Sequence, residues 1–333
     1  MRVSFSVGVV VAVVALVALS LPPAAAEGLP LGGGSGLVFA TAAEGREVVA
    51  AEDEFTARMS PFDRQARLKS AGPVSSAEHR AFAARSVLEW GDRDRRAITG
   101  AMRGLEARFT ELGVRFPDRV LLVKTSGDEE GGAAYTRGTA IMLPAKVLGS
   151  TTPVLRRLLC HELFHVLSRS RPALREKLYA SIGFLPCGDV VLPGDLEDRR
   201  ITNPDAPLFD HCIRVTVDGV ERSMVPVLWS RTATYDAKAG KAFFDTMEFR
   251  LLAVRLEGDP SRGVPEVDDA GEPIMTKPEG AAGFFEQVGR NTGYLIHPEE
   301  ILADNFELLV AADRRPPNPE IVRRLGEILG AAE

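Results

Sequence analysis

The chain has 333 residues, a formal net charge of −6 and five histidines. Apolar residues make up 45% and charged residues 26%, which excludes a wholly disordered, collagen-like or coiled-coil chain. The acidic balance argues against nucleic acid as a partner, because binding to phosphates needs a concentrated basic surface. Three cysteines are too few for a fold built on disulfides. The length allows one large domain or two smaller ones.

The first 26 residues have the pattern of a secretory signal peptide. Arg2 is the only charged residue before Glu27, residues 7–19 are apolar, and residues 24–26 are alanines that suit a cleavage site. An uncleaved membrane anchor is the alternative, but this apolar run is short for a membrane-spanning helix. We therefore expect removal of residues 1–26 and an extracytoplasmic protein (secreted or periplasmic), with no stable insertion in a membrane.

The next segment is predicted to be a flexible leader. Residues 27–45 are rich in glycine and alanine, which is typical of flexible segments. Helices are predicted after it. Ser75 and Glu78 have the spacing of a capping box ahead of an apolar run. A regular apolar stripe then predicts a single helix over residues 92–112.

The middle of the chain alternates between strand and helix signals. Residues 120–123 and 139–143 are short apolar runs that predict strands, and a helix is predicted after them. From about 183 to 275, glycine, proline and aspartate separate β-like runs, with Asp218 and Gly219 as a hairpin signal. We interpret residues 183–275 as a β-rich insertion.

The predicted compartment is oxidising and permits disulfides. Cys187 and Cys212 both lie in turn-rich sequence and are a candidate disulfide pair. Cys160 lies in a predicted helix and is expected to be a buried thiol. His211 beside Cys212 lacks the ligand spacing of a zinc site, so we interpret it as part of a local cluster only.

The five residues from His161 to His165 read His-Glu-Leu-Phe-His within a predicted helix. Residues four positions apart face the same side of a helix, so both imidazoles can bind one metal ion. Glu162 borders that face and can act as a general base on a metal-bound water without binding the metal itself. The alternative is that two histidines of the protein core have this spacing by chance.

A catalytic zinc ion needs a third protein ligand. No histidine follows at the short spacing used by some metallopeptidases. A helix predicted over residues 298–311 carries Glu300 and Asp304 on one face. Glu300 can complete the ligand set, with Glu299 or His297 as alternatives, and Asp304 can hydrogen-bond a ligating histidine. Acidic residues that only stabilise the helix N-terminus are the competing interpretation.

On these two motifs the chain resembles the gluzincin metallopeptidases, which carry H-E-x-x-H on one helix and E-x-x-x-D on a later one. The resemblance implies one catalytic Zn²⁺ ion bound by His161, His165 and Glu300. It implies Glu162 as the general base and Asp304 as the hydrogen-bond partner of a ligating histidine.

The resemblance also extends to the substrate side of the site. Tyr294, six residues before Glu300, resembles the tyrosine with which some gluzincins stabilise the oxyanion. An ordinary loop tyrosine is the alternative. Residues 139–143 resemble the edge strand on which gluzincins bind an extended substrate.

Together these features predict an α+β, zincin-like domain over residues 46–333. Its active-site helix would lie beside a sheet with a free edge strand, and the β-rich insertion would separate the two metal-binding helices. The expected function is zinc-dependent hydrolysis of peptide bonds in a peptide or protein substrate. Two alternatives stay open: a non-catalytic zinc-binding module whose metal is structural, and a zinc hydrolase of a non-peptide amide or ester.

Overall fold

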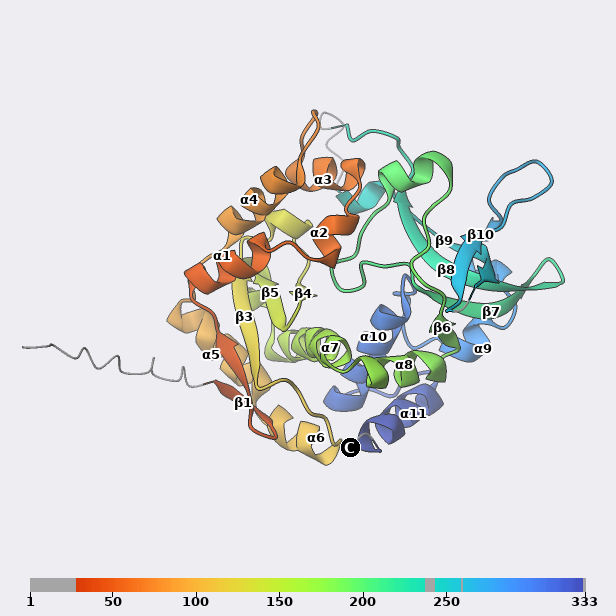
Figure 1. The fold of residues 1–333 in the computed structure, drawn as a ribbon. Coiled ribbons are helices and arrows are strands. Elements are labelled where there is room, and N and C mark those ends of the chain that lie inside the picture. Colours follow the sequence, from red (N-terminus) through yellow and green to blue (C-terminus); the bar gives the residue numbers. More distant parts are fainter. Residues whose placement is uncertain (1–27, 237–242, 259, 332–333) are drawn as a thin grey trace, which may run out of the picture.

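A computed structural model describes residues 28–236, 243–258 and 260–331. The signal peptide predicted for residues 1–26 lies outside these ranges. Figure 1 shows two sheets on opposite sides of a central pair of helices, α7 (Thr152–Ser170) and α10 (Pro298–Ala311). Within the described ranges, no helix combines the length and the apolar character needed to cross a membrane.

The first sheet has the strand order β1-β2-β3-β5-β4, with β2–β3 and β3–β5 parallel and the outer pairs antiparallel. Its strands are β1 (Leu29–Gly32), β2 (Ser35–Phe39), β3 (Arg119–Thr125), β4 (Tyr135–Arg137) and β5 (Ala140–Pro144). The prediction that residues 139–143 form an edge strand is wrong, because β5 lies between β3 and β4 and is buried throughout. The chain reverses at Gly138, which places the shorter β4 at the edge.

The prediction of a flexible leader over residues 27–45 is wrong for residues 28–45. Glycines 32–34 have positive φ, which glycine adopts without strain: Gly32 ends β1, and Gly33 and Gly34 form the turn to β2. The hairpin joins the sheet because β2 pairs with β3. Leu31 and Leu37 are fully buried, so apolar burial outweighs the flexible composition.

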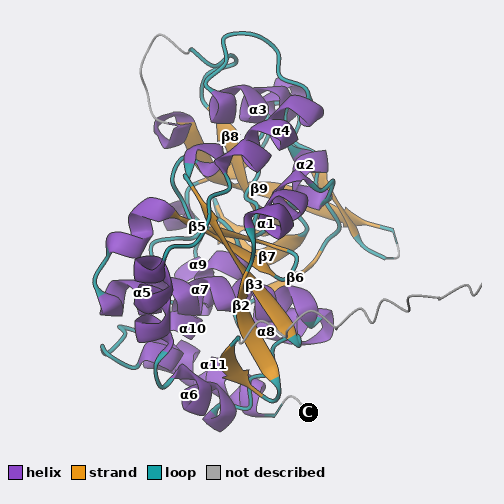
Figure 2. Ribbon diagram, turned by 90° about the vertical axis from the view of Figure 1, so that its left-hand side faces the viewer, coloured by secondary structure: helices purple, strands orange, loops and turns teal. Residues whose placement is uncertain are grey.

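Helices cover both faces of this sheet (Figure 2). Val120, Leu122 and Ile141 face the core that contains α7, whereas Val123 and Met142 pack in a separate cluster with the helices on the other face. This alternation follows from the two-residue period of a strand. The helices of the N-terminal part are α1 (Ala42–Ala50), α2 (Glu54–Arg58), α3 (Pro61–Leu68), α4 (Ser76–Ser86), α5 (Asp92–Met102) and α6 (Leu105–Glu111).

These helices confirm one sequence prediction and contradict another. The capping box of Ser75 and Glu78 is confirmed at the start of α4. The single helix over residues 92–112 is wrong, because Gly104 takes a left-handed φ of 82° and separates α5 from α6. The apolar stripe continues across this break, since Ile98 and Phe109 are both fully buried.

The second sheet confirms the β-rich region predicted at about 183–275. It has the antiparallel order β10-β9-β8-β7-β6, with β11 paired to β9, and a two-residue turn at Asp218 and Gly219 joins β7 to β8. Ile213 and Met224 from this sheet belong to the same core as α7, so the region is packed into the domain. The strands are β6 (Phe184–Pro186), β7 (His211–Val217), β8 (Val220–Ser230), β9 (Met247–Glu257), β10 (Arg262–Pro265) and β11 (Met275–Thr276).

The central helices α7 and α10 pack against each other through aromatic side chains. The ring centroids of Phe164 and Phe306 are 5.6 Å apart, and Ile301 and Leu302 are fully buried. The bounds predicted for the second of these helices, residues 298–311, are confirmed. The remaining helices are α8 (Pro172–Ser181), α9 (Phe284–Val288) and α11 (Pro319–Gly330).

We expect Leu37→Ala to lower the free energy of unfolding by about 2–5 kcal/mol, because it removes a fully buried side chain from the core. Leu185→Ala is the matched control, since Leu185 is 59% exposed and its truncation should change stability by less than about 0.5 kcal/mol. Urea unfolding of both variants measures the difference. Wild-type stability of Leu37→Ala would contradict the packing of β2 on the domain.

Candidate metal centre

Three predicted ligands converge between α7 and α10. Nε2 of His161 lies 3.1 Å from Oε2 of Glu300, and Nε2 of His165 lies 3.6 Å from the same oxygen. The two histidines are one helical turn apart, and the packing of α10 on α7 brings Glu300 opposite both. All three ligand atoms lie within 4.8 Å of one another, a spacing at which one ion can contact them all.

The outer nitrogen of each histidine faces a carboxylate. Nδ1 of His161 lies 2.9 Å from Oδ1 of Asp304, and Nδ1 of His165 lies 2.9 Å from Oε1 of Glu299. A carboxylate that accepts from Nδ1 leaves Nε2 as the nitrogen available to a metal. The second oxygen of Asp304 accepts a hydrogen bond from the hydroxyl of Thr292. Asp304 therefore lies beside one of the predicted ligands, as expected, and that ligand is His161.

Glu299 has a role that the sequence analysis missed. Besides His165, its carboxylate accepts hydrogen bonds of 2.5 Å from the hydroxyls of Ser168 and Tyr179. Neighbouring helical residues point about 100° apart, which lets Glu299 and Glu300 serve different nitrogens of the histidine pair. The acidic doublet was the one available signal, since two adjacent acids on a buried helix both need partners.

His297, the other alternative to Glu300 as a ligand, lies outside the converging set. Its Nδ1 accepts a hydrogen bond of 3.1 Å from the backbone N–H of Glu299 and thereby caps α10. A histidine that accepts at Nδ1 keeps its proton on Nε2, and that nitrogen has no lone pair for a metal. The geometry therefore favours Glu300 over both Glu299 and His297.

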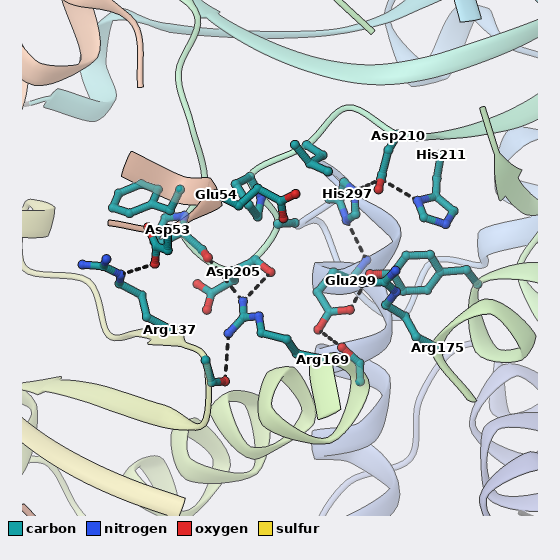
Figure 3. Close-up of a pocket in the computed structure, with 18 residues that line it drawn as sticks. Asp53, Glu54, Arg137, Arg169, Arg175, Asp205, Asp210, His211, His297 and Glu299 are labelled. Atoms are coloured by element: carbon teal, nitrogen blue, oxygen red, sulfur yellow. Dashed lines mark hydrogen bonds and ion pairs between the residues drawn. The ribbon is translucent and has the colours of Figure 1, made fainter. Parts of the chain in front are cut away.

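Asp210, His211 and His297 form a second cluster, which lies in a cavity of about 340 Å³ (Figure 3). The two ring nitrogens of His211 lie 2.6 Å from Asp210 and 3.0 Å from Glu176. Although burial opposes it, these carboxylates raise the pKa of His211. These side chains form an ion-pair network, and their ligand atoms also lie within 4.8 Å of one another, a spacing that suits a metal ion. The sequence interpretation, a local cluster without a zinc site, stays a prediction.

Charges in the converging set reinforce one another. Burial lowers the pKa of His165, but the charges of Asp205 and Glu300 and the hydrogen bond to Glu299 raise it to about 9. Burial also raises the pKa of Glu300, but the nearby charges of His165 and His161 bring it to about 2. At neutral pH Glu300 is therefore ionised, and His165 carries a proton that a metal ion would displace on binding.

The donor set fits a zinc ion. Nε2 of His165 is buried and, within the described part of the chain, has no hydrogen-bond partner. An unpaired polar atom in a protein interior is costly, and a bound cation removes that cost. Two imidazole nitrogens and one carboxylate oxygen are a typical ligand set for catalytic zinc, which keeps a fourth position open.

Glu162 is placed beside these ligands, as predicted. It is 2% exposed, and its Oε2 accepts a hydrogen bond of 2.9 Å from the hydroxyl of Thr136 on β4. Burial raises the pKa of Glu162, against the lowering effect of the charges on His165 and His161. Thr136 carries no signal in the sequence, because β4 has only three residues and no clear pattern.

Tyr294 also lies at the site. It lines a cavity of about 60 Å³ together with Asn203 and Asp205. Desolvation of its hydroxyl, followed by the negative charges of Glu300 and Asp205, raises the pKa of Tyr294 well above its usual value. The phenol therefore stays protonated at neutral pH and can donate a hydrogen bond.

A loop of the β-rich region enters the same site. The side-chain amide of Asn203 donates a hydrogen bond of 2.5 Å to Oε1 of Glu300. The carboxylate of Asp205 accepts one of 2.6 Å from the backbone N–H of Thr136. No motif or spacing marked these residues, because their partners lie far away in the sequence.

The predicted disulfide is not formed in the structure. Cys187 and Cys212 are free thiols that lie near each other at the β6–β7 end of the second sheet. Their proximity keeps oxidation to a disulfide as a prediction for the extracytoplasmic compartment. Cys160 is fully buried in α7, as expected.

Comparison of the chain with protein-family models, with curated proteins and with solved structures found no match in any of the three.

We expect Glu299→Gln to weaken zinc binding about 10- to 100-fold, because the charged partner of His165 Nδ1 is lost. Glu286→Gln is the matched control, since Glu286 is an exposed glutamate on α9. Competition titration against a fluorescent zinc chelator measures both affinities. Equal affinities of the two variants would contradict this role for Glu299.

Proposed function

We propose that the protein is a zinc-dependent metallopeptidase of the zincin-like type, which hydrolyses peptide bonds in an extracytoplasmic compartment. One observation carries the proposal. Nε2 of His161 and Nε2 of His165 both face Oε2 of Glu300. The buried carboxylate of Glu162 lies within 4.8 Å of a ring nitrogen of His165. The arrangement matches the ligand set and general base that the resemblance to gluzincins implies. The proposed substrate is a peptide or protein.

His161, His165 and Glu300 would hold the metal, and Asp304 and Glu299 would orient the two imidazoles. A bound zinc ion supplies Lewis acidity, which lowers the pKa of water to about 7 and polarises a carbonyl group. The hydrogen bonds to Asp304 and Glu299 keep both rings in one orientation.

Glu162 performs the proton transfers in this proposal. Its carboxylate accepts a proton from the attacking water and returns it to the nitrogen of the leaving amine. The hydrogen bond from Thr136 orients the carboxylate for both steps. The phenol of Tyr294 donates to the oxygen on which negative charge develops.

β4 offers the backbone for an extended substrate. It is the outer strand of its sheet, and edge strands can pair with an added peptide. Thr136 links this strand directly to Glu162. A peptide paired with β4 would therefore lie beside the proposed general base.

One observation favours a second candidate, a non-catalytic zinc-binding module. A carboxylate oxygen of Asp205 lies within 4.8 Å of ligand atoms of Glu162 and His165, so Asp205 can supply a fourth protein ligand. Zinc with four protein ligands is structural. A hydrolase of a non-peptide amide or ester would use the same residues as a peptidase, and a substrate screen separates those two.

The first test is the zinc content of the mature chain. We expect one zinc ion per chain in the wild type and a large loss in Glu300→Ala, because two imidazoles alone hold the metal weakly. Glu286→Ala is the control and should keep its zinc. Elemental analysis gives the ratios. Wild-type protein without zinc after metal loading would end the peptidase proposal.

The second test separates catalysis from metal binding. We expect Glu162→Gln to keep its zinc and to lose about 100- to 10,000-fold in turnover, because the base is removed and the ligands remain. Glu54→Gln, at an exposed position of the larger cavity, should retain wild-type turnover. Hydrolysis of a quenched fluorescent peptide library gives the rates. Undiminished turnover in Glu162→Gln would refute the assignment of the base.

A further inference from the structure

We propose that residues 202–206 form an autoinhibitory segment that covers the metal centre in this conformation. The inference rests on the proposed function, because it concerns access to the same site. The segment belongs to the long connection between β6 and β7, and it lies over α7 near the edge of the first sheet.

Two side chains of the covering segment reach the proposed ligands and base. Asn203 donates a hydrogen bond to the carboxylate of Glu300. Asp205 brings a carboxylate oxygen within 4.8 Å of ligand atoms of both Glu162 and His165. This is the side of the ligand set where the base must meet water and substrate. Asp205 therefore occupies space that the reaction needs.

The covering segment also uses the backbone of the edge strand. The N–H of Thr136 points away from β5 and donates a hydrogen bond of 2.6 Å to Oδ1 of Asp205. A substrate strand added to β4 would need such outward-facing backbone groups for its own hydrogen bonds. Asp205 thus occupies two positions that a bound substrate would need: the space beside Glu162 and the outward-facing N–H of Thr136 on β4.

Arg169 clamps the covering segment onto α7. Its guanidinium donates to the carbonyl oxygens of Pro204 and Asp205, at 3.3 and 3.0 Å, and to that of Gly138 beyond β4 at 3.3 Å (Figure 3). Pro204 and Asp205 line both the cavity of about 340 Å³ and the one of about 60 Å³. The covering segment therefore contributes to the walls of both cavities.

The start of the covering segment has a separate anchor. The backbone N–H of Thr202 donates a hydrogen bond of 3.0 Å to the carboxylate of Asp63. Its carbonyl oxygen accepts a hydrogen bond of 2.8 Å from the guanidinium of Arg67, and both partners lie on α3. Asp63 and Arg67 are themselves buried. Breaking the contacts of Asn203, Asp205 and Arg169 would free the centre of the segment while Thr202 stays attached. Opening of the site can therefore be local and reversible.

The test measures access to the metal without relying on turnover. Acetohydroxamate, a small zinc chelator, is titrated calorimetrically into zinc-loaded wild type, Asp205→Ala and the exposed control Asp198→Ala. A covered site lowers apparent affinity by the fraction of molecules that are open, so we expect about tenfold tighter binding in Asp205→Ala. Asp198→Ala should match the wild type.

A second variant guards against a folding defect in Asp205→Ala. Arg169→Gln leaves every side chain of the metal centre in place and removes the clamp, so it should also bind acetohydroxamate more tightly than the wild type. Wild-type affinity in both variants would overturn the covering role.

Peptide hydrolysis by the same proteins distinguishes the two proposals. Tighter acetohydroxamate binding together with faster hydrolysis in Asp205→Ala supports both. Tighter binding with no hydrolysis in any variant supports the covering segment and refutes the peptidase. Hydrolysis by the wild type that Asp205→Ala fails to increase, with unchanged acetohydroxamate affinity, refutes autoinhibition and leaves the peptidase standing.

Discussion

The site depends on the packing of α10 against α7. Apolar contacts such as Phe164 with Phe306 hold the two helices together. That packing places the histidines of α7 opposite the acidic side chains of α10: His161 contacts Asp304 and Glu300, and His165 contacts Glu299 and Glu300. Since the two helices are far apart in the sequence, no local preference can produce this arrangement. The hydrophobic core is thus the scaffold on which the polar site is assembled.

Burial gives the site its chemical character. Charged groups are rarely buried unless they are paired, and here each histidine has a carboxylate at its outer nitrogen. The carboxylate of Glu299, which contacts His165, is itself held by hydrogen bonds from the hydroxyls of Ser168 and Tyr179. Within the described part of the chain, Nε2 of His165 is buried without a hydrogen-bond partner, and it faces the place where a metal ion would complete the arrangement.

The second sheet contributes to the site as well as to the core. Its strands extend the hydrophobic interior around α7, and one of its connections carries Asn203 and Asp205 to the metal centre. The β-rich region therefore does more than lengthen the interval between the two motifs. It places the polar side chains of Asn203 and Asp205 beside Glu300, Glu162 and His165.

The sequence by itself determined the local features: the helix around His161, Glu162 and His165, the helix at 298–311, and the β-rich region. These depend on spacing, capping and turn residues, which act over a few positions. Tertiary structure decided the rest. The hairpin at 28–39 is ordered because its leucines are buried, and β4 is the edge because the chain reverses at Gly138. The partner of Glu299 and the position of Asp205 follow from contacts between distant segments, and no local pattern records such contacts.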